Sequence, residues 1–224
     1  MNTQGNLHTF DEHTLHIAAA YMTAKETVIE QGYADEIDWQ DCLKFNDIAE
    51  SDFLRESAWV ILSAGMNERV IRNKFPAISS AFRDWESAAI IVRNRSRCRQ
   101  VALAVFCNIK KVDAILETAR ILAERGFQTV KADILEHGVD SIRQFPYMGP
   151  ATSFHLAKNL GLPLAKPDRH LVRVARKTGF PSPAVMCDRI SQVVGDKVPV
   201  IDLVIWRYAT LNKQYLNIFG TPAS

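Results

Sequence analysis

Helical periodicity runs through most of this 224-residue chain, whereas the alternation of apolar and polar residues that marks a β-strand is nowhere sustained. Glycine or proline recurs at intervals that suit short connections between helices. The pattern predicts an all-α protein, and an apolar content of 47% is enough for one larger domain or for two small lobes with a cleft between them. The expected helices are residues 12–31, 52–63, 67–75, 77–84, 85–93, 96–109, 112–124, 129–137, 139–144, 150–160, 168–178, 183–194 and 198–211.

Charge is distributed unevenly along the chain, although the formal net charge is only +2. Residues 1–56 hold 12 acidic and 3 basic side chains, whereas residues 141–180 hold seven Lys or Arg side chains and the single carboxylate of Asp168. A basic segment of this kind favours a polyanion, and nucleic acid is the leading expectation. Two unrelated solvated faces would give the same charge pattern.

A second group of cations falls at an expected helix junction. Its members are Arg93, Arg95, Arg97 and Arg99. Side chains of this type could hold a phosphate backbone, and a solvated turn would explain them equally well. The sequence leaves both readings open.

The sequence also argues against several classes of protein. No stretch approaches the roughly 20 apolar residues of a membrane span, and residues 1–13 lack the basic-then-apolar order of a signal peptide. We therefore expect a cytoplasmic protein with no membrane partner. The four cysteines form no C-x-x-C pair, which argues against a zinc site, an iron–sulfur cluster and a disulfide framework. His13 and His16 have no third ligand nearby, so we expect no metal and no cofactor.

A turn between two short helices is predicted at residues 145–149, Phe-Pro-Tyr-Met-Gly. Gly149 is free to take a positive φ, and such a turn presents backbone N–H groups outward. Thr152 lies in the first turn of the next helix, where its hydroxyl can supplement those donors, and Lys158 adds charge further along. A packing turn between core helices is the alternative.

Asp168 follows a proline and is expected at the start of a helix, where a carboxylate normally caps free N–H groups. The same geometry permits chemistry if a phosphodiester binds nearby. A rigidly held carboxylate could stabilise positive charge on a sugar ring, or orient or deprotonate a water molecule.

These residues together resemble the helix-hairpin-helix family of base-excision DNA glycosylases, whose pattern is a Leu-Pro-Gly-apolar-Gly hairpin followed by an Asp-x-His-apolar-x-Arg strip. Residues 59–78 are also similar to the first core helix of that family and the loop that follows it. The resemblance implies two helical lobes with a cleft: a six-helix core with the hairpin over residues 50–165, and a second lobe from residues 1–49 and 166–224. The matching residues are Phe145, Pro146, Met148, Gly149, Thr152, Asp168, His170 and Arg173.

The resemblance implies an enzyme that flips a damaged or modified base out of double-stranded DNA and cleaves its N-glycosidic bond with Asp168 and a water molecule. Ala151 stands where bifunctional members carry a lysine, so no lyase activity is expected. Tyr147 replaces the first hairpin glycine and could pack on a sugar or a base. The iron–sulfur motif of some relatives is missing. The remaining substrates are alkylated bases or bulky bases such as glucosylated hydroxymethylcytosine of phage DNA, which implies a role in repair or in antiviral defence.

The DNA contacts implied by the resemblance come from three places in the chain. The wedge that fills the gap left by the flipped base maps to Met66, with Asn67 beside it. No obligatory protein partner is evident. The other expected DNA contacts are Tyr147, Met148, Gly149, Ala151, Thr152, Lys158, Arg169, His170 and Arg173.

Two alternatives to an enzyme stay open. A non-catalytic DNA-binding protein would use the same hairpin for phosphate contact, with Asp168 only as a helix cap. A helical scaffold for other proteins would carry an incidental basic face.

Overall fold

A computed structural model describes residues 10–220 of the chain, and within this part every regular element is a helix and no strand forms. The all-α prediction is confirmed. Residues 1–9 and 221–224, the ends of the expected terminal lobe, lie outside the described residues. In this part of the chain no helix is long and apolar enough to cross a membrane.

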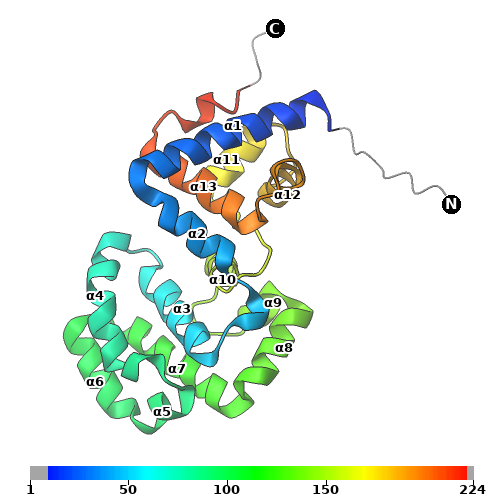
Figure 1. Ribbon diagram of the computed structural model, residues 1–224. Coiled ribbons are helices and arrows are strands. Elements are labelled where there is room, and N and C mark those ends of the chain that lie inside the picture. The colour runs from blue at the N-terminus through cyan, green and yellow to red at the C-terminus, as the bar shows by residue number, and fades with distance from the viewer. Residues whose placement is uncertain (1–9, 221–224) are drawn as a thin grey trace, which may run out of the picture. The chain divides into compact units, whose positions relative to one another are not determined.

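The helices follow one another with short connections (Figure 1). The α-helices are α1 (Glu12–Val28), α2 (Ala34–Cys42), α3 (Glu50–Ser63), α4 (Glu68–Ala81), α5 (Ala88–Arg93), α6 (Arg95–Val105), α7 (Ile109–Arg125), α8 (Phe127–His137), α9 (Val139–Ile142), α10 (Pro150–Asn159), α11 (Arg169–Lys177), α12 (Pro183–Val194) and α13 (Val198–Leu211). Shorter helical segments are η1 (Ile29–Tyr33), η2 (Phe45–Asp47), η3 (Arg83–Trp85) and η4 (Tyr215–Asn217).

The chain divides into two compact units, one formed by Leu43–Leu162 and the other by Met1–Cys42 with Pro163–Ser224. We call them the central unit and the terminal unit. Lys131 of α8 holds η2 and the segment after it within the central unit. The Lys131 ammonium donates to the carbonyl oxygens of Asn46 and Ile48 at 2.7 and 3.0 Å.

The core of the central unit forms around α3, which packs against α4, α7 and α10. Val60, Ile61 and Leu62 are all buried, as expected for a run of residues that is apolar on every side of the helix. Phe53 at the other end of α3 packs edge-on against Phe145, with the ring centroids 5.3 Å apart. This contact anchors the start of the 145–149 turn in the core.

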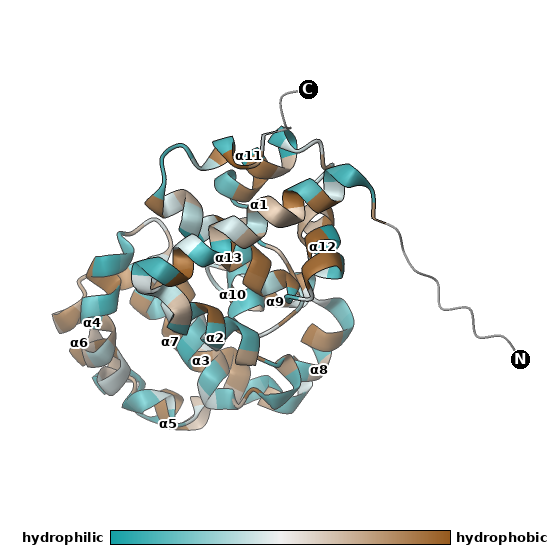
Figure 2. Ribbon diagram, turned by 45° about the horizontal axis from the view of Figure 1, so that its top comes forward, coloured by the Kyte–Doolittle hydropathy of each residue, from teal (hydrophilic) through white to brown (hydrophobic). Residues whose placement is uncertain are grey.

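The core of the terminal unit forms around α13, which packs against α1, α2, α11 and α12. Its apolar residues join a buried cluster that includes Leu171 and Val174 of α11. A polar contact fixes α1 to the connection before α13, because the Tyr21 hydroxyl and the Lys25 ammonium bind the Asp196 carboxylate at 2.5 and 2.7 Å. The surface helices carry separate apolar and polar faces, which appear as brown and teal bands on α8 and α12 in Figure 2.

Two element predictions are wrong. The sequence indicated no helix at residues 34–42, yet α2 forms there after a kink at Gly32, whose φ is +86°. Its apolar face is small, since Ile37 is its one buried large apolar side chain, and short polar helices of this kind give weak periodicity. A break was also expected at Pro76, but α4 continues through it. Ile71 and Ile78 are buried on either side of the proline and hold the helix in line.

Candidate functional site

The turn at residues 145–149 joins α9 to α10 in the central unit. The Met148 N–H donates to the Phe145 carbonyl at 3.2 Å, which closes the turn. Tyr147 takes the positive φ, at +63°, whereas Gly149 has a φ of −71°. The expectation that Gly149 would use its conformational freedom here is therefore wrong. A left-handed residue other than glycine costs about 1–2 kcal/mol, so the turn is strained at Tyr147.

The side chains of this turn alternate between the core and the surface. Phe145 and Met148 are both buried, whereas Tyr147 is 41% exposed and Gly149 is exposed. Burial withdraws the Met148 side chain from the expected DNA contacts, because it serves as an anchor of the turn. Tyr147 and Gly149 remain accessible to a ligand.

The first turn of α10 has backbone donors that no side chain caps. Gly149 is the N-cap residue and Pro150 follows it, and no side chain within the described residues accepts a hydrogen bond at this helix start. The sequence predicts that the Thr152 hydroxyl donates to a ligand. In the structure it donates to the Tyr147 carbonyl at 2.6 Å and stabilises the turn. The N–H groups of Ala151 and Thr152 lie in the first turn of the helix, where an anion binds favourably.

Lys158 does not fit the expected DNA interface. It lies near the end of α10 and only 8% of its surface is exposed. Most of the Lys158 side chain is therefore packed inside the central unit. Lys158 is thus separated in exposure from Tyr147 and Gly149, which both lie at the surface of the 145–149 turn.

Asp168 caps α11 in the terminal unit. Its Oδ1 atom accepts hydrogen bonds from the N–H groups of His170 and Leu171 at 2.8 and 3.0 Å. Within residues 10–220 its second carboxylate oxygen, Oδ2, has no hydrogen-bond partner. The side chain is half-buried. The carboxylate is thus held by one oxygen and leaves the other for a ligand or a water molecule.

The segment before Asp168 is fixed by a carboxylate that the sequence did not single out. Asp202 is buried on α13, and its Oδ2 atom accepts from the Lys166 N–H at 2.5 Å. The Asp168 N–H in turn donates to the Lys166 carbonyl at 2.8 Å. A buried carboxylate within an apolar run, Val-Ile-Asp-Leu-Val, is the signal that could have identified it, because such a group is retained only with partners. Asp202 therefore sets the path of the chain into α11.

The other predicted residues of α11 differ in exposure. Arg169 and Arg173 are exposed, and His170 is half-buried with its ring edge-on against Tyr215 at 5.3 Å between centroids. Burial lowers the pKa of His170, which favours the neutral imidazole. The His170 Nδ1 atom is buried without a hydrogen-bond partner among the described residues. Arg169 and Arg173 supply the exposed positive charge beside Asp168, whereas His170 packs as part of the fold.

Met66 and Asn67 lie in the connection between α3 and α4, in the central unit. Met66 is 41% exposed. Asn67 is the N-cap residue of α4, and its Oδ1 atom accepts from the Arg69 N–H at 2.9 Å. The preceding Gly65 has a φ of +68°, which makes this connection a tight turn. Met66 is thus presented at the surface, and Asn67 has a capping role.

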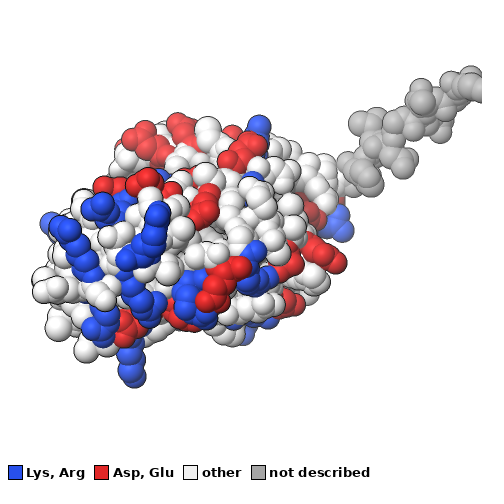
Figure 3. Space-filling view, turned by 90° about the horizontal axis from the view of Figure 1, so that it is seen from below, with Lys and Arg blue, Asp and Glu red and all other residues white. Residues whose placement is uncertain are grey.

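The arginines at the end of α5 and the start of α6 divide into paired and exposed side chains. Arg99 binds the Asp113 carboxylate through Nε and Nη2, at 2.6 and 3.2 Å. Arg93 and Arg97 are exposed and have no ion pair within the described part of the chain. Basic side chains gather on this part of the surface, on the side of the molecule where α4 and α6 lie (Figure 3). Half of the cluster is therefore structural, and half remains available to an anion.

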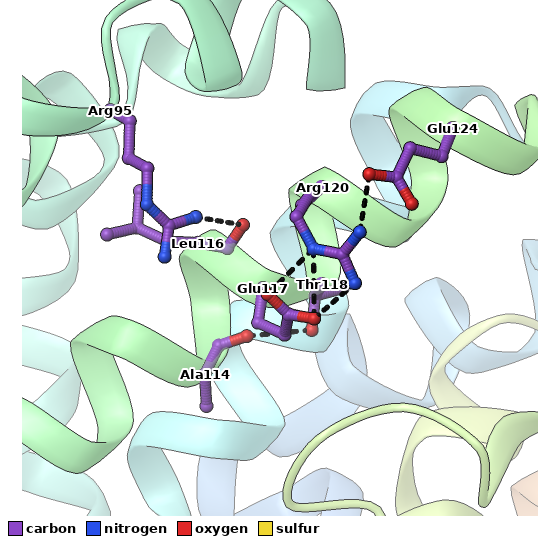
Figure 4. A network of polar contacts seen from close by, with 7 residues as sticks. All are labelled: Arg95, Ala114, Leu116, Glu117, Thr118, Arg120 and Glu124. Carbon is purple, nitrogen blue, oxygen red and sulfur yellow. Dashed lines mark hydrogen bonds and ion pairs between the residues drawn. The ribbon is translucent and has the colours of Figure 1, made fainter.

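Arg95 contributes to the packing of α6 on α7. Its guanidinium donates to the Leu116 carbonyl at 3.4 Å, next to an ion-pair network on α7 (Figure 4). In that network Arg120 binds Glu117 at 2.6 Å and also Glu124. The hydrogen bonds from Arg120 lower the pKa of Glu117, which favours the ionised carboxylate in this pair.

The candidate residues lie at three places in the chain, of which the α3–α4 connection with Met66 and Asn67 is one. Tyr147, Gly149, Ala151 and Thr152 meet around the turn in the central unit, and Asp168, Arg169 and Arg173 meet on the first turns of α11 in the terminal unit. Comparison of the chain with protein-family models, with curated proteins and with solved structures finds no match.

Proposed function

We propose that this protein is a monofunctional DNA N-glycosylase, which flips one damaged or modified base out of a duplex and hydrolyses its N-glycosidic bond. The observation that carries the proposal is the placement of Asp168. Its Oδ1 atom is fixed by two backbone N–H groups, and within residues 10–220 its Oδ2 atom has no partner. A preorganised carboxylate of this kind stabilises charge that develops in a transition state without having to reorganise.

The proposed reaction uses water as its second reactant. As the bond between C1′ and the base breaks, the base leaves with the electron pair and positive charge develops on the sugar ring. The Asp168 Oδ2 atom stabilises this charge or accepts a proton from the attacking water, whose oxygen forms the new bond to C1′. The proton that the water loses ends on the departing base. The products are the free base and an abasic site in an intact strand. The α11 cations Arg169 and Arg173 support the binding of the flanking phosphates.

The central unit supplies the second part of the proposal. The uncapped N–H groups at the start of α10 suit a phosphate, and the exposed Tyr147 suits a sugar or a base. Base flipping requires a side chain that fills the vacated place in the stack, and the exposed Met66 is the proposed wedge. The absence of an amine at Ala151 supports hydrolysis without strand cleavage.

The substrate proposed for this site is an alkylated base or a bulky modified cytosine such as glucosylated hydroxymethylcytosine. The test uses end-labelled duplexes that each carry one alkylated, oxidised, deaminated or glucosylated base. After incubation with the protein, strand breaks are measured with and without hot alkali. We expect breaks for one substrate class and only after alkali. Breaks without alkali would contradict hydrolysis, and no breaks on any duplex would contradict the enzyme.

A non-catalytic DNA-binding protein is the second candidate, and one observation favours it. The Asp168 carboxylate already has a structural role as the N-cap of α11, which needs no chemistry. Under this alternative the protein binds duplexes in a salt-dependent manner and releases no base, and Asp168→Asn changes neither property.

A further inference from the structure

A buried lysine holds the connection between α3 and α4, the segment that carries Met66. Lys111 belongs to α7, and its Nζ atom donates to the carbonyl oxygens of Leu62 and Ala64, each at 2.6 Å. Only 5% of Lys111 is exposed. Burial lowers the pKa of this ammonium, so a lysine here is disfavoured unless its hydrogen bonds offset the loss of water. The two carbonyls at the end of α3 supply that compensation.

Lys111 is itself held firmly at the start of α7. The Asn108 side chain caps this helix and accepts from the Lys111 N–H at 3.2 Å. The helix packs along α3, so the ammonium reaches the end of α3 from a rigid base. The Lys111 side chain is therefore held in place by α7, and its hydrogen bonds fix the start of the α3–α4 connection.

The connection is tied down at both of its ends. At its start, the Lys111 ammonium binds the Ala64 carbonyl, and the Met66 N–H donates to the Ser63 carbonyl at 3.0 Å. At its end, Asn67 caps α4. These contacts define a short loop whose exposed tip is Met66.

The surface beside Met66 suits a nucleic-acid duplex. Val70 lies one helical turn beyond Met66 and is also exposed, so the apolar surface extends along the start of α4. The exposed Arg69 lies between them in the sequence and places a cation next to this apolar tip. An exposed apolar side chain with a cation near it in the chain suits a base-stack wedge that also contacts phosphate.

We propose that Lys111 is a positioning residue, which holds the Ala64 carbonyl so that Met66 enters the base stack as a preformed wedge. This inference rests on the proposed glycosylase function. A loop that is ordered before binding does not have to be ordered during base flipping, so binding energy goes into extrusion of the base. Loss of the ammonium leaves two carbonyls without their donor and releases the loop.

The first test measures the loop in the protein without DNA. Hydrogen exchange of residues 62–70 is compared in the wild type, Lys111→Met and two controls. Lys110→Met removes the exposed neighbouring lysine, and Leu122→Ala destabilises α7 further along the helix, away from the loop. We expect exchange at residues 62–70 to be at least tenfold faster in Lys111→Met than in the wild type. The two controls should exchange these residues at the wild-type rate. Equal exchange in Lys111→Met and the wild type would overturn the inference, whatever the protein does to DNA.

The second test measures base flipping on a duplex with 2-aminopurine beside the substrate base. We expect Lys111→Met to reduce the flipping rate and single-turnover base release at least tenfold, with duplex affinity changed less than threefold. Lys111→Arg, which keeps a charged donor, should restore most of the loss, whereas a purely structural defect would affect Leu122→Ala equally. Faster exchange with unchanged flipping would overturn the wedge role. If Lys111→Met does not fold, Lys111→Gln keeps an N–H donor without the charge and takes its place.

The two tests separate this inference from the proposed function. If the wild-type protein releases no base from any duplex, the glycosylase proposal fails and the wedge role fails with it. The exchange result then still decides whether Lys111 anchors the loop. If the wild type releases a base but Lys111→Met flips and releases it at the wild-type rate, only the inference about Lys111 fails.

Discussion

The Thr152 hydroxyl donates a 2.6 Å hydrogen bond to the carbonyl of Tyr147, the residue that takes the left-handed conformation in the turn before α10. This bond joins the first turn of the helix to the strained residue that precedes it. It compensates part of the cost of the positive φ and keeps the exposed Tyr147 next to the uncapped N–H groups of α10.

Tyr147→Gly is expected to stabilise the protein. Glycine adopts a positive φ without the steric cost that tyrosine has, although it also raises the entropy of the unfolded chain. We expect a net gain of up to about 1 kcal/mol in the free energy of unfolding, measured by urea denaturation. Tyr147→Ala is the matched control, because alanine loses the ring but keeps the strain. An equal stability of the glycine and alanine variants would contradict the strain at this position.

Arg173→Gln is expected to weaken binding to every duplex to a similar degree. Arg173 is exposed on the second turn of α11, and a contact with phosphate carries no sequence information. The slope of the logarithm of affinity against the logarithm of salt concentration should fall by about one unit. Arg189→Gln on α12 is the control, since Arg189 is also exposed in the terminal unit and hydrogen-bonds to Gln192. An unchanged slope for Arg173→Gln would exclude it from the DNA interface.

Glu56→Gln is expected to stabilise the protein near neutral pH but not near pH 4. Burial raises the pKa of Glu56 on α3, although Asn159 donates a 3.0 Å hydrogen bond to its carboxylate. Because the folded state holds this proton more tightly than the unfolded state, its contribution to stability is present at low pH. That contribution is lost as the pH rises through the raised pKa. Glutamine accepts the same hydrogen bond without ionising.

The free energy of unfolding at both pH values tests this prediction, with the exposed Glu86→Gln as the control. A Glu56→Gln variant that is less stable than the wild type near neutral pH would show that the ionised carboxylate stabilises the fold.

The helical fold was largely predictable because helical periodicity and the positions of glycine and proline follow directly from the sequence. The helical pattern at residues 52–63 predicted α3, and the proline before Asp168 indicated the cap of α11. Periodicity was weaker in α2, whose buried face includes Gln40, and the proline rule failed in α4 because tertiary packing overrode it.

The candidate site was less predictable, because burial and backbone conformation depend on tertiary contacts. Glycine rules assigned the positive φ to Gly149, whereas the closing hydrogen bond of the turn places it at Tyr147. Lys158 was expected to be a surface cation because of its charge, but the residue is buried. Lys111 gave one usable signal, since it shares the helical spacing of the buried residues Ile115, Thr118 and Leu122. The adjacent Lys110 is exposed, and from the sequence alone a pair of lysines indicates a polar face of the helix.

The measurement that tests the central claim most directly is single-turnover base release by Asp168→Asn. Asparagine caps a helix about as well as aspartate, so this variant should fold with unchanged thermal stability and bind the modified duplex at least as tightly. We expect base release to fall by roughly a hundredfold to ten-thousandfold, the typical contribution of a catalytic acid or base. Asp188→Asn, an exposed change on α12, should retain full activity. Base release by Asp168→Asn at the wild-type rate would contradict a catalytic role for Asp168.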